Sequence, residues 1–295
     1  TPPVGASFDT IPGSIWTEPD WEVFRRAVLA AERDSVAEMP LGEAVAHIGR
    51  GFVGFPYTPQ TLQTPWIAAA AAGRPMDGAL ARLGVNLREF DCVTFVENVL
   101  ALARFVRDRG AAALDDPERA RAAYEAELIA LRYRGGAMAG YASRLHYFSE
   151  WLSDNAARGR LALIHPEFEA GEDPEPIDFM TTHVEAYPAL ADDPGSVARI
   201  REVEARLNAE LPRSYIPEEG IDGIADRIRT GDVIAATSTV RGLDVAHTGI
   251  AVRVDGELRL MHAPLVGSVV QISEVPLADR IQRIEGQDGV LVARP

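Results

Sequence analysis

The run Asp244-Val-Ala-His-Thr-Gly-Ile-Ala-Val-Arg-Val-Asp-Gly-Glu-Leu-Arg-Leu-Met-His262 decides the fold of this chain. It holds two stretches rich in β-branched and aliphatic residues, separated by Asp255-Gly256. An Asp-Gly pair between two such stretches is a strong signal for a tight hairpin turn. We therefore predict two antiparallel strands, with His247 at the start of the first and His262 at the end of the second. Antiparallel pairing brings these two ends to the same edge of the sheet, so the two histidines should be neighbours.

Around this hairpin, helical and β-rich segments are distributed unevenly along the chain. Apolar side chains recur at helical spacing in residues 18–48 and 91–109, and residues 111–228 are mostly helical and charged. Further short β-rich runs begin at Asp232 and Val269. Helices followed by an antiparallel sheet indicate an α+β fold. We expect one domain, 1–295, with an N-terminal helical segment 1–40, a core of about 41–110 and 229–295, and a helical insertion of about 111–228.

The bulk properties exclude several classes of protein. The 295 residues carry a net charge of −15, from 44 acidic and 29 basic side chains. Nucleic-acid binding needs a basic face, so we expect no nucleic-acid partner. The longest apolar run, residues 66–72, is far shorter than the roughly 18 to 20 residues of a membrane span. The chain begins Thr-Pro-Pro, without methionine or a leader, as expected of a trimmed or shortened chain.

The single cysteine, Cys92, stands at a position that favours chemistry. Most lone cysteines are small buried apolar residues, but Cys92 opens a helix directly after Asp91, a natural N-cap. The free N–H groups and the dipole of a helix N-terminus stabilise a thiolate, so we expect the pKa of the thiol to be lowered. The same N–H groups can bind an oxyanion. Cys92 is therefore the candidate nucleophile.

The two hairpin histidines supply what a cysteine nucleophile needs, a base held in place by a third polar group. We assign His247 as the base and His262 as the group that orients it. Because the unperturbed pKa of histidine is about 6.5, His262 is expected to contribute to the loss of activity in acid.

Together these segments resemble the NlpC-type papain-like cysteine peptidases of bacterial envelopes. The resemblance is carried by Phe90-Asp-Cys-Val-Thr-Phe-Val, Asp244-Val-Ala-His-Thr-Gly-Ile and Leu260-Met-His-Ala. Within that group the chain is most similar to the N-acetylmuramoyl-L-alanine amidase-like family. Pro56-Tyr57, Arg144-Leu-His-Tyr…Trp151 and Gly242-Leu-Asp match that family's pattern as well, so the likeness runs from about residue 41 to the C-terminus.

The resemblance implies an activity and further site residues. The bond cleaved would be the lactyl amide between N-acetylmuramic acid and L-alanine, in a protein that is periplasmic or otherwise exported to the cell envelope. Tyr57 would lie beside the nucleophile and donate to the oxyanion, and Asp91 could meet a substrate amine besides capping its helix. Arg144 and His146 would lie near the cleft. Asp244 would shape the turn before the base.

Two other functions stay open at this point. One is an endopeptidase that cuts the stem peptide after D-glutamate with the same catalytic residues. The other is a catalytically silent module that binds glycan or peptide. We expect no metal and no cofactor, because the chain has no His-Glu-x-x-His and no Cys or His cluster. The Gly49-x-Gly-x-x-Gly54 spacing does not predict a dinucleotide site, because it follows a helix and Pro56 blocks the helix it should open.

Overall fold

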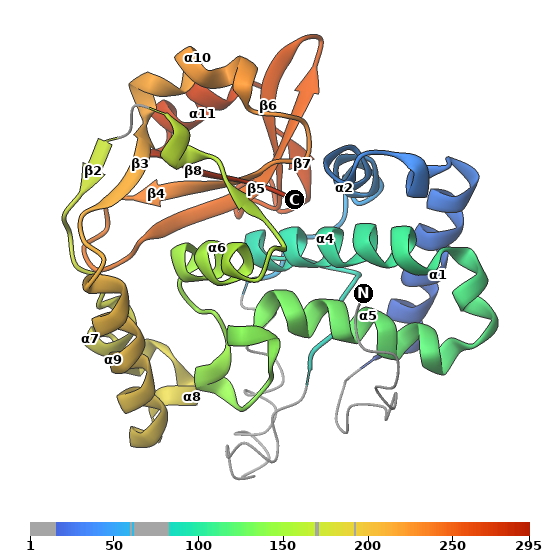
Figure 1. Ribbon diagram of the computed structural model, residues 1–295, viewed down its shortest axis with the longest axis horizontal. Helices are drawn as coiled ribbons and strands as arrows, with labels where there is room; N and C mark the ends of the chain where they lie inside the picture. The colour runs from blue at the N-terminus through green and yellow to red at the C-terminus, as the bar shows by residue number, and fades with distance from the viewer. Residues whose placement is uncertain (1–15, 60, 62–82, 169–170, 192) are drawn as a thin grey trace.

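The computed structural model describes residues 16–59, 61, 83–168, 171–191 and 193–295, so what was expected of residues 1–15 and 66–72 lies outside the described residues. The chain forms an α+β fold around one antiparallel sheet, as the sequence predicted (Figure 1). The strand order is β2-β3-β8-β4-β5-β6-β7, and β1 pairs with β8 off this path. The strands are β1 (Ala162–Leu163), β2 (Gly171–Asp173), β3 (Arg213–Pro217), β4 (Val233–Ser238), β5 (Val245–Val254), β6 (Glu257–His262), β7 (Gln271–Ile272) and β8 (Gln287–Arg294).

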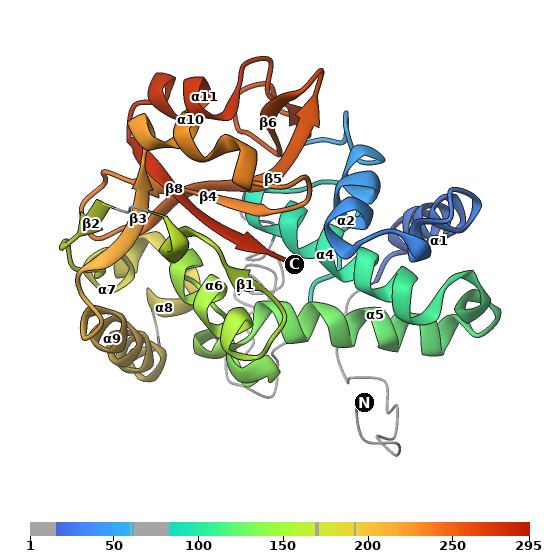
Figure 2. The same ribbon diagram turned by 45° about the horizontal axis from the view of Figure 1, so that its top comes forward.

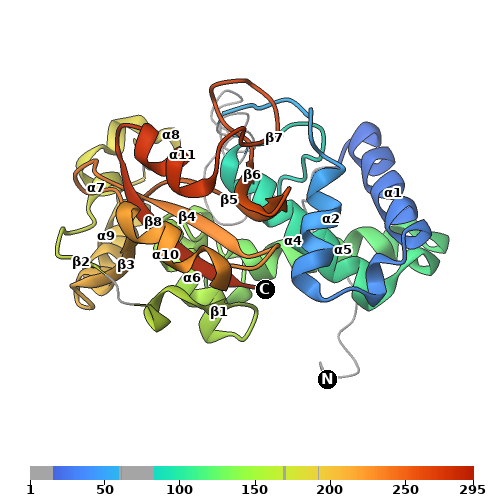
Figure 3. The ribbon, with the colours of Figure 1, turned by 90° about the horizontal axis from the view of Figure 1, so that it is seen from above.

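Helices cover both faces of the sheet, and one of the two helical layers is much larger. Helix α4 packs against β5 below the sheet in Figure 1, and α10 and α11 lie above it. Seen from above, α1, α2 and α5 occupy the side of the molecule away from β2 and β3 (Figure 3). The helices are α1 (Glu18–Arg33), α2 (Leu41–Arg50), α4 (Cys92–Arg109), α5 (Pro117–Arg132), α6 (Phe148–Ala157), α7 (Phe179–Thr182), α8 (Pro188–Ala191), α9 (Pro194–Asn208), α10 (Ile221–Ile224) and α11 (Leu277–Arg283).

The hairpin predicted from the sequence is present. Val254 pairs with Glu257, and both turn residues have positive φ, 52° at Asp255 and 84° at Gly256. A two-residue turn with both φ angles positive is the type I′ turn, whose twist matches that of the flanking strands. Strand β6 ends at His262 as predicted, whereas β5 begins two residues before His247.

Helix α4 also has the predicted bounds. Asp91 is its N-cap, and the Asp91 Oδ1 atom accepts hydrogen bonds from the backbone N–H (2.8 Å) and the hydroxyl (2.9 Å) of Thr94. Gly110 ends the helix at φ 65°. A buried ion pair joins α4 to α5: Arg132 Nε lies 2.7 Å from Glu97 Oε2, with both side chains at most 3% exposed. The helix that begins at the cysteine is thus fixed at its start and along its length.

The stretch 111–228 is mostly helical, as expected, but it also contributes β1, β2 and β3 to the sheet. The sequence did not reveal β8, which lies between β3 and β4 in the sheet (Figures 1 and 2). The middle of β8, Val290 to Ala293, is apolar and buried on both faces, so it lacks the alternation that marks a half-exposed strand. The strands β1 to β3 have only two to five residues, too few to establish a period.

Candidate active site

The two hairpin histidines meet as the sequence predicted. His247 Nε2 lies 2.7 Å from His262 Nδ1, and the two rings stand edge to face with centroids 4.9 Å apart. Gly249 makes this approach possible, because a Cβ atom built there would lie 2.7 Å from the Met261 carbonyl oxygen and 2.9 Å from His262 Cβ. The strand pairing and this glycine therefore hold the two rings within hydrogen-bond distance.

Cys92 is the first residue of α4, and its sulfur faces the same part of β5. The backbone N–H groups of Thr248, Val93 and Cys92 itself act on the thiol by hydrogen bonding. Thr248 directly follows His247 in the chain and lies two residues beyond the last pair of the β5–β6 ladder, Ile250 with Met261. The backbone N–H of Thr248 therefore has no partner on β6 and can donate to the sulfur of Cys92. Among the described residues no hydrogen bond joins Cys92 to His247, and catalytic bonds are often long before substrate binds.

The expected lowering of the thiol pKa is wrong for the substrate-free protein. The pKa of Cys92 is raised to about 12, first by burial and then by the charge of Asp91, and the three N–H groups oppose this rise without prevailing. Burial likewise lowers the pKa of His247 to about 3, with a smaller contribution from Arg280. Placing a charged group in a poorly solvated site costs more free energy than the N–H groups and dipole of a helix terminus contribute in stabilising it. Near neutrality the site therefore holds a thiol and an uncharged imidazole.

The same cause corrects the expectation that His262 titrates near neutrality. Burial lowers the pKa of His262 to about 2, and the charges of His247 and Arg280 act in the same direction. Only 2% of the residue is exposed, and its Nε2 atom is buried without a hydrogen-bond partner among the described residues. Since Nδ1 faces His247, a neutral His262 can accept a hydrogen bond there only if its own proton is on Nε2.

Tyr57 and Asp91 lie beside Cys92, as the resemblance implied. The backbone of Tyr57 forms a parallel bridge with Phe90, and the pKa of the Tyr57 phenol is raised first by burial and then by the charges of Cys92 and Asp91. Asp91 is engaged within the protein: Oδ1 caps α4 and Oδ2 accepts a 2.7 Å hydrogen bond from the hydroxyl of Thr61. The cap is confirmed, and the meeting with a substrate amine stays a prediction.

Asp244 joins the loop before His247 to a helix far away in the chain. Its carboxylate accepts a 2.7 Å hydrogen bond from the backbone N–H of Ser149, in the first turn of α6. The side chain is buried, and burial raises the pKa of this carboxyl. Asp244 therefore does more than shape a turn, because it fixes α6 next to the start of β5.

Arg144 and His146 form a separate cluster. Arg144 Nη2 lies 2.9 Å from His146 Nδ1, and His146 Nε2 lies 2.9 Å from the Tyr141 carbonyl oxygen. Burial and the charge of Arg144 lower the pKa of His146 well below its usual value. Arg144 Nη1 is buried without a partner among the described residues, and within that part of the chain no bond joins either side chain to the histidine pair.

Comparison with known proteins assigns the family. The model of the N-acetylmuramoyl-L-alanine amidase-like family matches residues 47–287, most of the chain.

The chain belongs to this family.

Several solved structures are similar to this member of the amidase-like family over most of its length. An N-acetylmuramoyl-L-alanine amidase from Bacteroides uniformis is 30% identical, with a TM-score of 0.72 over 86% of this chain and 98% of the other. A protein from Bacteroides fragilis described as a putative xylanase is also 30% identical, with a TM-score of 0.71 over 84% and 99%. A Legionella pneumophila protein, 18% identical, shares the fold (TM-score 0.64, over 94% and 95%). Among curated proteins, none matches the chain.

One residue of this amidase-like site was missed by sequence reasoning. Arg280, on α11, lowers the pKa of both histidines and interacts electrostatically with Cys92. Helix α11 packs on the sheet face that carries Leu260, and Arg280 Nη1 donates a 3.3 Å hydrogen bond to the side-chain oxygen of Gln287. No ion pair of Arg280 is found among the described residues. Arg280 is one of two arginines in a seven-residue helix and gives no sequence signal, because only the folded sheet brings it to the site.

The described part of the chain contains neither a metal-binding group nor a membrane-spanning helix. No group of three or more His, Cys, Asp or Glu side chains in the described part of the chain could hold a metal ion. Within the same residues, no helix is long and apolar enough to cross a membrane.

Proposed function

We propose that this protein is a cysteine-dependent amidase of the bacterial cell envelope, with a papain-like fold of the NlpC type. Its reaction is hydrolysis of the lactyl amide between N-acetylmuramic acid and L-alanine in peptidoglycan fragments. The observation that carries the proposal is the 2.7 Å contact between His247 and His262, next to the cysteine at the start of α4. Membership of the amidase-like family and the Bacteroides uniformis amidase support the choice of substrate.

The first step moves one proton and forms one bond. With His247 Nε2 facing His262, Nδ1 is the nitrogen left to take the thiol proton of Cys92. The sulfur attacks the lactyl carbonyl carbon as that proton leaves, and the carbonyl π electrons move to the oxygen. Because thiol and imidazole are both uncharged beforehand, the proton moves during the attack rather than in advance. The charge of the imidazolium is stabilised by His262 Nδ1, which accepts from the Nε2–H of His247.

The negative oxygen that forms needs donors at the start of α4. The backbone N–H of Cys92 is one such donor, because the first N–H groups of a helix have no partner within it. The phenol of Tyr57 is the second, and its raised pKa keeps the proton available for donation. These two groups bind the charge that the attack creates.

Two bond cleavages complete the reaction. The tetrahedral intermediate re-forms its carbonyl, the C–N bond breaks, and the amine of L-alanine takes the proton from His247. A water molecule then gives one proton to His247 and attacks the thioester. The C–S bond breaks, and the thiolate of Cys92 takes back the proton from His247, leaving the lactyl carboxylic acid of N-acetylmuramic acid, which ionises by giving its proton to the released amine. No proton or electron is left over, so no cofactor enters the scheme.

The remaining candidate residues support this site without touching the reacting atoms. Asp244 fixes the loop before the base through α6. The resemblance to the family supports a place for Arg144 and His146, which contact each other, at the border of the cleft. The division into a core of about 41–110 and 229–295 and an insertion of about 111–228 belongs to the same proposal, as does export to the periplasm or envelope.

The test is digestion of one defined muropeptide followed by mass spectrometry. Wild-type protein should release N-acetylmuramic acid and a peptide that begins with L-alanine, and Cys92→Ala should release neither. Release of a peptide that begins after D-glutamate would assign the endopeptidase activity instead. Chelators should leave the rate unchanged. If the muropeptide binds and no product appears, the protein is a binding module.

A further inference from the structure

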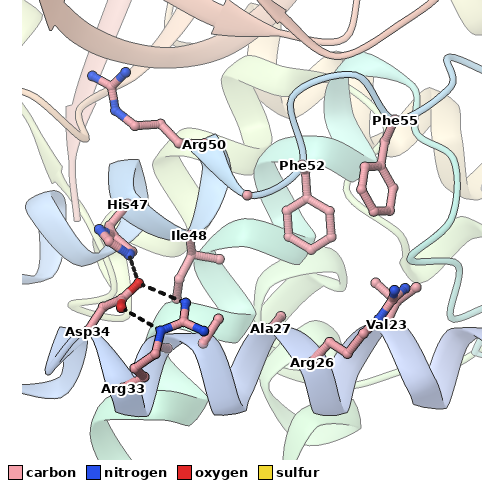
Figure 4. A pocket seen from close by; sticks show the side chains of 13 residues that line it. Val23, Arg26, Ala27, Arg33, Asp34, His47, Ile48, Arg50, Phe52 and Phe55 are labelled. Atoms are coloured by element: carbon pink, nitrogen blue, oxygen red, sulfur yellow. Dashed lines mark hydrogen bonds and ion pairs between the residues drawn. The ribbon is translucent and has the colours of Figure 1, made fainter.

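A cavity lies between α1 and α2, away from the proposed catalytic residues. It has a volume of about 520 Å³, within the range of small-ligand sites. Figure 4 shows α1 along its base, with Phe52 and Phe55 extending over it from the loop after α2. Cys92, His247 and His262 are not among the residues that line it.

The interior of this cavity is apolar. Ala27 and Ala30 of α1 form one wall, and Ile48 forms the other. Phe52 and Phe55 pack edge to face, with ring centroids 5.2 Å apart. Such a lining suits methyl groups better than sugar hydroxyls, because it offers few hydrogen-bond partners.

The rim of the cavity is positively charged. Three arginines line it (Arg26, Arg33 and Arg50), against the single carboxylate of Asp34. Asp34 is already engaged, since it binds Arg33 at 3.0 Å and His47 at 3.1 Å, and these contacts lower its pKa. Arg26 has no ion pair among the described residues, and Arg50 donates only to the carbonyl oxygen of Arg253. On a protein of net charge −15, this local excess of cations favours an anionic ligand.

A second hollow continues the cavity toward the loop of Tyr57. It shares Val23, Arg26 and Phe55 with the first cavity and extends to Pro56. Two paired charges also line it: Arg88, which binds Asp20 at 2.9 Å, and Glu22, which binds Arg25 at 3.0 Å. We call the two hollows together the α1–α2 groove. Its far end is thus formed by the residue next to Tyr57, so an occupant of the groove would contact the segment that carries the proposed oxyanion donor.

We propose that the α1–α2 groove is a second binding site that takes an acidic peptide with small apolar side chains. The carboxylates would bind Arg26 and Arg50, and alanine methyl groups would lie against Ala27, Ile48 and Phe52. The identity of the peptide rests on the proposed function: in peptidoglycan it is the stem peptide, in which alanine residues flank carboxylate-bearing ones.

The experiment measures binding of the free tetrapeptide L-Ala-γ-D-Glu-diamino acid-D-Ala to full-length Cys92→Ala protein by calorimetry. Arg26→Gln and Arg50→Gln should each weaken binding by about tenfold, the usual cost of losing one charged hydrogen bond. Arg119→Gln is the control, because Arg119 lies outside the lining of both hollows and forms an exposed ion pair with Asp116 at 3.3 Å. Ala30→Phe, which fills the cavity, should abolish binding while thermal unfolding shows an intact fold.

Each outcome decides the proposal. Equal affinity in the Arg26, Arg50 and Arg119 variants would overturn it, since the peptide would then bind elsewhere. Binding of phosphatidylglycerol vesicles with the same arginine dependence, without binding of the peptide, would also overturn it. Muropeptide cleavage by wild-type protein is scored separately. If the protein binds the peptide but cleaves no muropeptide, the proposed function is refuted and the groove stands. If it cleaves the muropeptide but does not bind the peptide, only the groove is refuted.

Discussion

Replacing Gly249 by alanine should separate the two histidines. The added Cβ would lie 2.7 Å from the Met261 carbonyl oxygen, and ordinary contact begins at 3.4 Å, so β5 and β6 must part by about 0.7 Å. Added to the 2.7 Å between His247 Nε2 and His262 Nδ1, this gives about 3.4 Å, beyond the usual hydrogen-bond range. We expect kcat/KM to fall by about 10²-fold, the cost of a misplacement near 1 Å.

The same substitution should lower the free energy of unfolding by about 1 to 3 kcal/mol, the range for overpacking a core. Two glycines provide matched controls. Gly289→Ala would place its Cβ 2.2 Å from the Ile216 carbonyl oxygen, between β8 and β3, so it should lose stability but keep its activity per folded molecule. Gly223→Ala meets nothing within 4 Å and should raise stability by about 0.5 kcal/mol.

The assay combines urea unfolding with kcat/KM on a muropeptide, corrected for the folded fraction. If Gly249→Ala loses stability as Gly289→Ala does but retains wild-type kcat/KM, His262 does not orient His247. If it loses neither, the close approach of β5 and β6 is itself wrong.

Three further predictions concern charge. Iodoacetamide should label Cys92 of substrate-free protein slowly at pH 7 and faster with rising pH beyond 9, because its pKa is about 12; a rate plateau below pH 7 would show a preformed thiolate. Arg280→Gln should shift the acid limb of kcat/KM from near pH 3 to a higher pH, because it removes a charge that opposes protonation of His247. The limb should stay below pH 6.5, because burial still lowers the pKa of His247. An unmoved limb would exclude Arg280 from the site. Glu97→Gln should lower the free energy of unfolding in urea by about 3 kcal/mol, since it leaves Arg132 charged and buried. Glu22→Gln, in an exposed pair with Arg25, should lower it by less than about 1 kcal/mol. Equal losses in the two variants would contradict the argument from burial.

The sequence predicted the elements whose signals are local. The Asp255-Gly256 turn, the cap at Asp91 and the stop at Gly110 each depend on a few adjacent residues, and the structure has all three. The meeting of His247 with His262 followed because one hairpin carries both.

What the sequence missed depends on packing between distant segments. Strand β8 could not be recognised, because burial on both faces removes the alternation of apolar and polar residues. Arg280 reaches the site only through the folding of α11 onto the sheet. The pKa values of Cys92 and His262 were expected at helix-terminus and solvent values, but burial by residues far away in the chain governs both.

The hairpin has a consequence for the order in which this site assembles during folding. His247 and His262 are joined by a two-residue turn, and hairpins of this kind form in about 1 to 10 μs. Cys92 is distant in the chain, so its arrival requires closure of a long loop and the docking of α4 on β5, which are slower events. We therefore expect the two histidines to meet before Cys92 reaches them, and until α4 docks the thiol should be an ordinary solvated cysteine with a pKa of about 8.5. Hydrolytic activity should consequently appear only with the last stage of refolding, after the near-native secondary structure is in place.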